Sequence, residues 1–153
     1  MNIAIVGGRD FNDYTLLKES LLAYISIYGV PENIVSGGAK GADTLAAQFA
    51  AEMGIPLLVF KPDYQKYGRG ATLVRNTQII ENADVVFAFW DGQSKGTKDS
   101  ITKAKKLQKE LHIISYGDVC FINLYPNGIL ELQKKLHSPK NSKNIGEAEN
   151  LSE

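Results

Sequence analysis

Short apolar runs alternate with helix-forming segments five times over the first 115 residues of the chain. We assign the apolar runs to strands over Asn2–Val6, Asn33–Ser36, Ile55–Phe60, Asp84–Trp90 and His112–Ser115. Parallel strands require a crossover connection, which is usually a helix. Nearly continuous apolar strands also indicate a sheet that is buried on both faces. The alternation therefore predicts an α/β, Rossmann-like, doubly wound fold, with a mainly parallel sheet and helices on both faces.

Segments with the helical spacing of apolar residues lie between these runs. The first begins near Asp13 or Thr15 and ends before Gly29. The others span Ala42–Met53, Thr72–Asn82 and Thr97–Glu110. The polar, aromatic-containing stretch Lys61–Gly70 is expected to be a loop.

A chain of 153 residues has the length of one domain. We predict a single domain over residues 1–137, with a late strand at Val119–Asn123 and a final strand or helix at Gly128–Leu136. Residues 138–153 read SPKNSKNIGEAENLSE and carry almost no large apolar side chains. We expect this last segment to be a disordered polar tail.

The 17 basic and 17 acidic residues cancel, so the composition provides no general attraction to nucleic acid or to an anionic membrane. A local basic patch is still compatible with this balance. Cys120 is the single cysteine, which excludes an internal disulfide, and no His/Cys cluster has the spacing of a zinc site. The N-terminus lacks the pattern of a signal peptide, and no apolar run reaches about 18 residues. We expect a cytoplasmic protein without a membrane span, a metal or a cofactor.

Polar loops that contain glycine follow three of the five predicted strands. In parallel sheets, ligands bind beyond the carboxyl ends of the strands. Glycine lets backbone N–H groups come close to a ligand, and a helix N-terminus favours an anion such as phosphate. The same glycines also suit tight turns with no ligand. The candidate ligand-binding residues of these loops are Gly7, Gly8, Arg9, Asp10, Ser36, Gly37, Gly38, Ala39, Lys40, Gly41, Asp43, Asp91, Gly92, Lys95, Gly96 and Thr97.

The common nucleotide fingerprints are absent. The first loop is not G-x-G-x-x-G, and the chain has no G-x-x-x-x-G-K-[ST] motif, which disfavours a dinucleotide dehydrogenase and an ATPase. Asp43 and Thr97 also suit helix capping, and Lys40 suits a solvated loop. The aromatic residues near the loops fit either base stacking or packing, and they are Tyr14, Tyr64, Tyr67 and Trp90.

The segment Tyr67–Asn76 adds further candidates. Arg69 and Arg75 are six residues apart and can face the same edge of the sheet, where a guanidinium group suits a phosphate or a carboxylate. Asn76 offers both a donor and an acceptor to a base, a ribose or a neighbouring loop. Asp91 follows the fourth strand, where a carboxylate can activate water or orient a ribose.

Four stretches of the sequence resemble the SLOG superfamily, and most closely its YspA/YpsA-related branch. They are GGRDF at 7–11, SGGAKGADTLAAQFA at 36–50, GRGATLVRNTQIIENADVVFAFWDG at 68–92 and SKGTKDSITKAKK at 94–106. The resemblance covers residues 1–115 and implies a nucleotide-like small-molecule ligand and a homodimer or higher homo-oligomer. SLOG domains also occur as sensors of NAD-derived and other nucleotide signals.

The sequence is also similar to the LOG phosphoribohydrolases, which release a base from a nucleoside monophosphate. Arg75 matches that family's arginine ahead of the fourth strand, and Gly92, Gly96 and Thr97 match part of its PGGxGTxxE loop. Asp99 lies near the position of its catalytic glutamate. The chain lacks the Pro-Gly-Gly, and its aspartate has a shorter reach than glutamate.

A third similarity is to DprA, the DNA-processing protein. Its SG-x-A-x-G-x-D-x-x-A loop matches residues 36–46, and its R-N-x-x-I-x-x-x-A/S-D stretch matches residues 75–84. DprA-type domains bind single-stranded DNA as dimers.

These observations give three hypotheses in order. The first is a sensor or sequestering protein that binds a nucleotide or a nucleotide derivative resembling ADP-ribose or an NAD derivative. The second is a hydrolase of the N-glycosidic bond, in which Asp91 or Asp99 is the catalytic carboxylate and Arg75 holds the phosphate. The third is binding of single-stranded DNA through Lys40, Arg69, Arg75 and Lys95.

Overall fold

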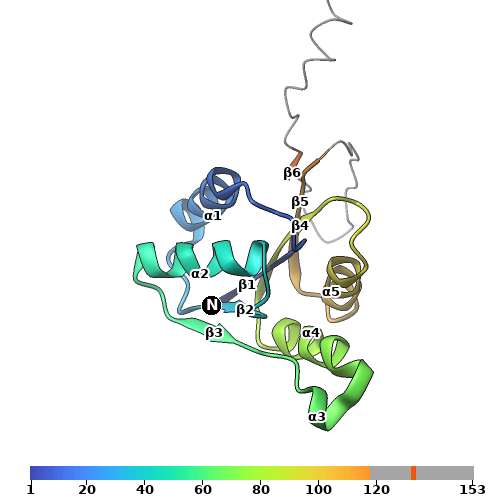
Figure 1. Cartoon of the computed structure of the whole chain (residues 1–153). Helices are drawn as coiled ribbons and strands as arrows, with labels where there is room; N and C mark the ends of the chain where they lie inside the picture. The colour runs from blue at the N-terminus through green and yellow to red at the C-terminus, as the bar shows by residue number, and fades with distance from the viewer. Residues whose placement is uncertain (118–131, 134–153) are drawn as a thin grey trace, which may run out of the picture.

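The computed structural model describes residues 1–117 and 132–133, and they form a parallel sheet with helices on both faces (Figure 1). The strand order is β3-β2-β1-β4-β5-β6, and every neighbouring pair is parallel. The chain runs outward from β1 through β2 to β3 and then returns to place β4 on the other side of β1. This reversal makes the fold doubly wound, as the sequence predicts.

The bounds of the elements follow the sequence pattern closely. The strands are β1 (Asn2–Gly7), β2 (Asn33–Ser36), β3 (Leu57–Val59), β4 (Val85–Trp90), β5 (Glu110–Ser115) and β6 (Leu132–Gln133). The helices are α1 (Tyr14–Tyr28), α2 (Ala42–Met53), α3 (Tyr64–Tyr67), the 3₁₀ turn η1 (Gly68–Gly70), α4 (Ala71–Glu81) and α5 (Lys95–Lys106).

Alternate residues of the central strands face opposite layers of the core. On one face, Ile5 and Phe87 pack in a cluster with Leu17 of α1 and Phe49 of α2. On the other face, alternate residues such as Ala88 belong to a cluster with side chains from α4 and α5. The two faces are therefore covered by different helix pairs (Figure 1). Since both faces are buried, the strands have no polar side, which explains their continuous apolar text.

The structure corrects the prediction at several places. Lys61–Gly70, predicted as a loop, contains α3 and η1, and the side chain of Asp63 caps α3 by accepting from the amide of Lys66 at 3.1 Å. Helix α5 begins at Lys95, two residues before the predicted start at Thr97, because the Ser94 side chain caps it. It ends at Lys106, and β5 therefore begins at Glu110.

Some predictions concern residues outside the described ranges. They are the late strand at Val119–Asn123, most of the segment Gly128–Leu136 and the polar tail 138–153. Within residues 1–117 and 132–133, no helix combines the length and the apolar character needed to span a bilayer.

The loop after β1 packs directly against the start of α2. Gly41, which precedes α2, has φ 77° and ψ −122°, a conformation that is strained for any residue with a Cβ. A Cβ at Gly41 would also contact the backbone of Gly8 and Arg9. The amide of Ala42 donates to the Gly8 carbonyl at 3.2 Å. This backbone contact fixes the β1 loop relative to the N-terminus of α2.

We predict that Gly41→Ala lowers the free energy of unfolding by at least about 3 kcal/mol, because backbone strain and steric overlap add at this position. Gly54→Ala is the matched control: Gly54 caps the other end of α2 with φ 66°, but nothing lies within 4 Å of an added Cβ. Its expected loss is about 1 kcal/mol. Denaturant unfolding measures both losses, and equal values would contradict the packing role of Gly41.

Candidate functional site

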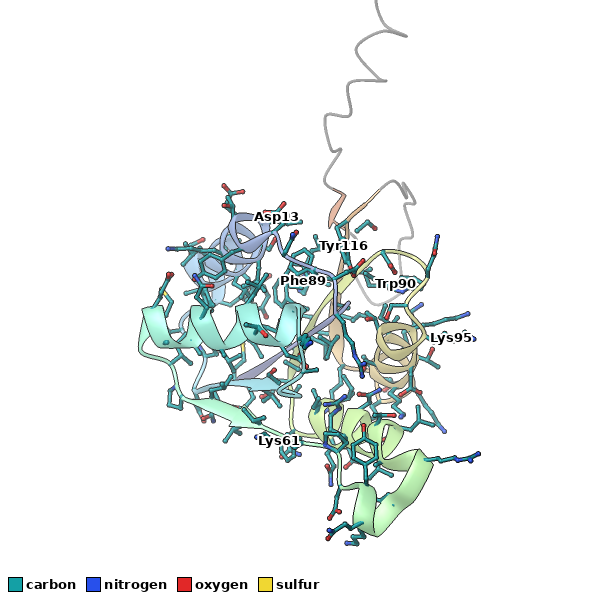
Figure 2. The ribbon with its side chains drawn as sticks, viewed as in Figure 1. Asp13, Lys61, Phe89, Trp90, Lys95 and Tyr116 are labelled. Atoms are coloured by element: carbon teal, nitrogen blue, oxygen red, sulfur yellow. The ribbon has the colours of Figure 1, made fainter. Side chains whose placement is uncertain are left out.

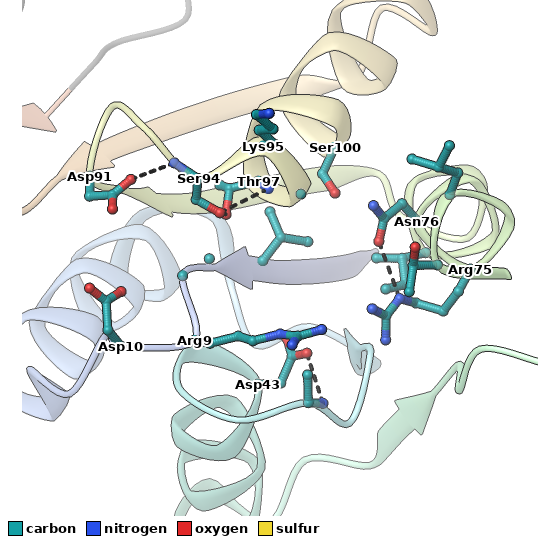
Figure 3. Close-up of a pocket in the computed structure, with 18 residues that line it drawn as sticks. Arg9, Asp10, Asp43, Arg75, Asn76, Asp91, Ser94, Lys95, Thr97 and Ser100 are labelled. Atoms are coloured by element: carbon teal, nitrogen blue, oxygen red, sulfur yellow. Dashed lines mark hydrogen bonds between the residues drawn. The ribbon is translucent and has the colours of Figure 1, made fainter. Parts of the chain in front are cut away.

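A cavity of about 580 Å³ opens at the carboxyl ends of β1 and β4, where the strand order reverses. Its walls come from the loop after β1, the start of α2, one side of α4 and the start of α5 (Figure 3). This is the position at which doubly wound sheets bind ligands. The volume falls in the range of small-molecule sites.

Many residues predicted for the site lie together in this wall. The predicted residues that line the cavity are Gly7, Gly8, Arg9, Asp10, Ala39, Asp43, Arg75, Asn76, Asp91, Lys95, Gly96 and Thr97. The predicted residues that do not line it are Ser36, Gly37, Gly38, Lys40, Gly41, Arg69, Gly92 and Asp99. Gly37, Gly41 and Asp99 instead support neighbours that do line it, whereas Arg69 is exposed on η1.

Sequence reasoning missed six lining residues: Val6, Thr72, Leu73, Ile79, Ser94 and Ser100. Three of these residues could have been found from helical spacing relative to a predicted site residue. Thr72 and Ile79 lie three residues before and four residues after Arg75, so they share one face of α4. Ser100 lies three residues after Thr97 on α5 in the same way.

Arg75 is buried, with only 8% of its surface exposed, and two hydrogen bonds hold its side chain in place. Its Nη1 donates to the Gly37 carbonyl at 2.7 Å, and its Nε donates to Asn76 Oδ1 at 3.2 Å. The ion pairs found among the described residues do not include Arg75. A buried guanidinium group with no carboxylate within ion-pair distance is well suited to an anionic ligand.

Asn76 connects Arg75 to α5. Its Nδ2 donates to Asp99 Oδ2 at 3.0 Å, and the same carboxylate oxygen accepts from Lys103 Nζ at 2.7 Å. Because the amide nitrogen of Asn76 must face the carboxylate, its oxygen faces Arg75, and the amide orientation is fixed. Asp99, one of the two predicted catalytic carboxylates, therefore lies behind Asn76 and acts on the cavity only through it.

Asp43 sits at the start of α2 beside Arg75. Its Oδ2 accepts from the Ala39 amide at 3.0 Å. Burial raises the pKa of this carboxyl, and the Ala39 hydrogen bond and the positive charge of Arg75 oppose the rise. The side chain thus folds the α2 loop and supplies part of the charge that balances Arg75.

The opposite end of the cavity is acidic. Asp91 Oδ1 accepts from the amides of Gln93 and Ser94, both at 2.8 Å, and so shapes the loop before α5. Tyr116 donates its hydroxyl to Asp10 Oδ1 at 2.7 Å. Burial raises the Tyr116 pKa well above its usual range, and the hydrogen bond to Asp10 and the charges of both aspartates raise it further. Tyr116 therefore remains a protonated donor near neutral pH.

The start of α5 forms the remaining wall. The Ser94 side chain caps the helix by accepting from the Thr97 amide at 3.5 Å. Among the described residues, the amides of Lys95 and Gly96 make no hydrogen bond, as is usual for the first turn of a helix. These amides, with the helix dipole, favour negative charge at this rim. The Lys95 side chain itself points away from Arg9 and Arg75 (Figure 3).

Most charged groups of the cavity lie toward one of two sides. Figure 3 shows the guanidinium groups of Arg9 and Arg75 toward one side, with the carboxylate of Asp43 beside them, and the carboxylates of Asp10 and Asp91 toward the other. The described residues contain no group of three or more His, Cys, Asp or Glu side chains suited to a metal ion. The arrangement offers donors to an anion at one end and acceptors to hydroxyl groups at the other.

A family model and one curated relative identify the family. The model of the YspA, cpYpsA-related SLOG family matches residues 1–67. The Gene 61 protein of Mycobacterium phage D29 is 31% identical over 124 residues, which is 76% of this chain and 96% of that protein. The chain belongs to the YspA, cpYpsA-related SLOG family.

Solved structures share the fold of this SLOG domain. DNA processing protein A from Helicobacter pylori has a TM-score of 0.58 at 20% identity, over 97% of this chain and 81% of that one. DNA processing protein A from Streptococcus pneumoniae has a TM-score of 0.61 at 18% identity, over 77% and 51%. The structural-genomics target TM1055 has a TM-score of 0.55 at 20% identity, over 96% and 98%. These likenesses confirm the predicted fold class.

The loop glycines of this SLOG domain have two different roles. A Cβ at Gly7 would lie 2.6 Å from the Cβ of Ala42, and one at Gly37 would lie 2.5 Å from Nη1 of Arg75. These glycines make room for other parts of the protein. Nothing lies within 4 Å of a Cβ added at Gly96. Since Gly96 lines the cavity, the space beside it is available to a ligand.

We predict that Asp43→Asn becomes more stable relative to the natural chain as the pH rises above the ordinary Asp value of 3.8. The folded state raises the pKa of Asp43, so it binds more protons than the unfolded state just above that value, and its stability falls as the pH rises. Asparagine has no charge to bury and keeps an oxygen for the Ala39 amide. Urea unfolding of both proteins at a series of pH values measures the difference, which is expected to grow toward neutrality.

Proposed function

We propose that this SLOG domain binds a nucleotide or a nucleotide derivative of the ADP-ribose or NAD-derivative type, as a sensor or a sequestering protein of the cytoplasm. The observation that carries the proposal is the separation of charge within one cavity. A nucleotide has the matching polarity, because its phosphate needs donors and its ribose hydroxyls need acceptors.

The phosphate is assigned to the side of Arg9 and Arg75. Arg75 is fixed in place by Gly37 and Asn76, so little side-chain entropy is lost when it meets an anion. The amides at the start of α5 lie in the same cavity and add a second set of donors. Arg9 is exposed and can close over a bound phosphate.

The ribose is assigned to the side of Asp10 and Asp91. Asp91 uses Oδ1 to hold the α5 loop, so Oδ2 is the oxygen available to a ribose hydroxyl. Asp10 is oriented by the Tyr116 hydroxyl. The apolar side chains of Val6, Leu73 and Ile79 complete the wall and provide surface for the base.

We predict that Gly96→Ala weakens AMP binding by about tenfold or more without lowering the free energy of unfolding. Gly96 lines the cavity and an added Cβ meets nothing within 4 Å, so the methyl group takes up open space at the cavity wall, and alanine favours the helix more than glycine does. Gly70→Ala is the matched control, because an added Cβ there also meets nothing within 4 Å but Gly70 does not line the cavity. Isothermal titration calorimetry with AMP, and with adenosine as the ligand without phosphate, measures the effect.

Several results would contradict this proposal. Equal affinities for AMP and adenosine would mean that the phosphate contributes nothing to binding. Equal affinity of Gly96→Ala and Gly70→Ala for AMP would place the ligand elsewhere. Arg75→Ala is a further variant and is expected to weaken AMP binding by at least about tenfold, since a hydrogen bond to a charged group contributes about 1.5–3 kcal/mol.

Hydrolysis of the N-glycosidic bond is the second candidate, and the position of Asp91 favours it. A carboxylate beside the ribose can stabilise positive charge at the anomeric carbon or activate a water molecule. Asp99 faces Asn76 and Lys103 instead, so its part in such a reaction is to position Asn76.

We predict that any release of adenine from AMP is abolished in Asp91→Asn and only reduced in Asp99→Asn. Asparagine at position 91 retains an oxygen for the loop amides but no negative charge. Chromatography of the free base measures the reaction. If AMP binds but stays intact over long incubation, the hydrolase hypothesis is rejected and the binding function is retained.

Single-stranded DNA ranks third. DNA processing protein A from H. pylori binds single-stranded DNA, but the cavity wall here balances Arg9, Arg75 and Lys95 with Asp10, Asp43 and Asp91. An equal number of cations and carboxylates gives no continuous basic track for a phosphate backbone. A homodimer or higher homo-oligomer, which the family resemblance implies, is part of the same proposal.

A further inference from the structure

A second cavity, of about 240 Å³, also has Arg75 in its wall. It is formed between the α3 segment and α4, and its wall includes Lys61, Lys66, Tyr67, Gln78 and Arg75. Arg75 also lines the main cavity. The two cavities are therefore neighbours, and the guanidinium-bearing side chain of Arg75 is a wall that they share.

The second cavity has an excess of available positive charge. The described ion pairs include neither Lys61 nor Lys66. Lys66 lies with its Nζ 5.1 Å from the ring centre of Tyr67. The carboxylate in this wall, Asp63, already accepts from the Lys66 amide as the cap of α3. The cavity is therefore suited to a second anionic or hydroxyl-rich group.

Tyr67 gives the cavity a surface for a flat group. Its side chain is 38% exposed, and Val74 and Gln78 of α4 lie in the same wall. An accessible aromatic ring beside lysine side chains suits a base or a sugar that is attached to a phosphate. Figure 2 shows Lys61 on the segment that leads from β3 to α3, beside α4.

Arg75 has one nitrogen left for a ligand. Its Nε and Nη1 are used by Asn76 and Gly37, and Nη2 makes no hydrogen bond to the described residues. A guanidinium group in this position can hold a phosphate bridge while the groups on either side of the bridge occupy separate cavities.

We propose that the ligand consists of two units joined through phosphate, with the bridge at Arg75, the first nucleoside in the main cavity and the second unit against Lys61, Lys66 and Tyr67. This inference rests on the proposed function and specifies the ligand class further. A mononucleotide fills only the main cavity. ADP-ribose, with a nucleoside and a second ribose joined by a diphosphate, has the required connection.

The test compares AMP with ADP-ribose by isothermal titration calorimetry on the full chain. The natural protein is expected to bind ADP-ribose about tenfold or more tightly than AMP, because the second unit adds contacts without a second association step. The double variant Lys61→Ala/Lys66→Ala is expected to lose most of this advantage while its affinity for AMP stays within about twofold. Both lysines are exposed, so the fold is retained.

Lys106→Ala is the matched control, since Lys106 is an exposed lysine on α5 that lines neither cavity. It is expected to bind both ligands like the natural protein. AMP and ADP-ribose of equal affinity would overturn the second subsite and leave the proposed function standing. A double variant that loses the same factor for both ligands would also overturn it.

Two further outcomes separate the hypotheses. If neither AMP nor ADP-ribose binds, the proposed function itself fails, and this inference fails with it. A ten-residue oligodeoxyadenylate that binds more tightly than ADP-ribose would overturn the two-unit ligand in favour of a polynucleotide. Its affinity would then also fall steeply with salt, which a titration at several salt concentrations detects.

Discussion

The hydrogen bond from Arg75 to the Gly37 carbonyl joins α4 to the loop after β2 across the end of the sheet. It is short, buried and formed by a charged donor, so it belongs to the stronger class of hydrogen bonds. Glycine at position 37 is what allows the guanidinium group to come this close. Asn76, which Asp99 holds from α5, fixes the other side of the same group. Three segments that are distant in sequence therefore determine where one positive charge lies, and the two cavities are arranged around it.

The neutral composition of the chain conceals a local separation of charge. Arg9 and Arg75 face Asp10 and Asp91 across the main cavity, while the second cavity adds Lys61 beyond Arg75. Such an arrangement of opposite charges produces a weaker long-range field than a cluster of like charges would. At short range, it distinguishes the phosphate end of a ligand from its hydroxyl end. This combination fits a small polar ligand better than a polyanion.

The sequence predicts the fold well because continuous apolar runs indicate strands that are buried on both faces. The alternating order of strands and helices then restricts the fold to a few possible topologies. It predicts less of the site. Arg75 and Asn76 are adjacent in sequence and both reach the cavity wall, but the sequence does not show that Asp99 turns toward Asn76. The sequence also does not reveal α3. This helix has only four residues after its cap, Asp63, which is too short to show a helical periodicity. Side-chain direction and short capped turns depend on tertiary contacts that one sequence does not specify.

The glycine-rich loops show why such a motif alone does not establish phosphate binding. The loop after β2 uses Gly37 to seat Arg75 and Gly41 to pack against the β1 loop, so its glycines are required whether or not a ligand is present. At the start of α5, Gly96 has no such internal partner, and the amides of Lys95 and Gly96 make no hydrogen bond to the described residues. The groups suited to bind an anion are therefore the first amides of α5 and the guanidinium group of Arg75. The loop after β2 contributes only indirectly, because it positions Arg75.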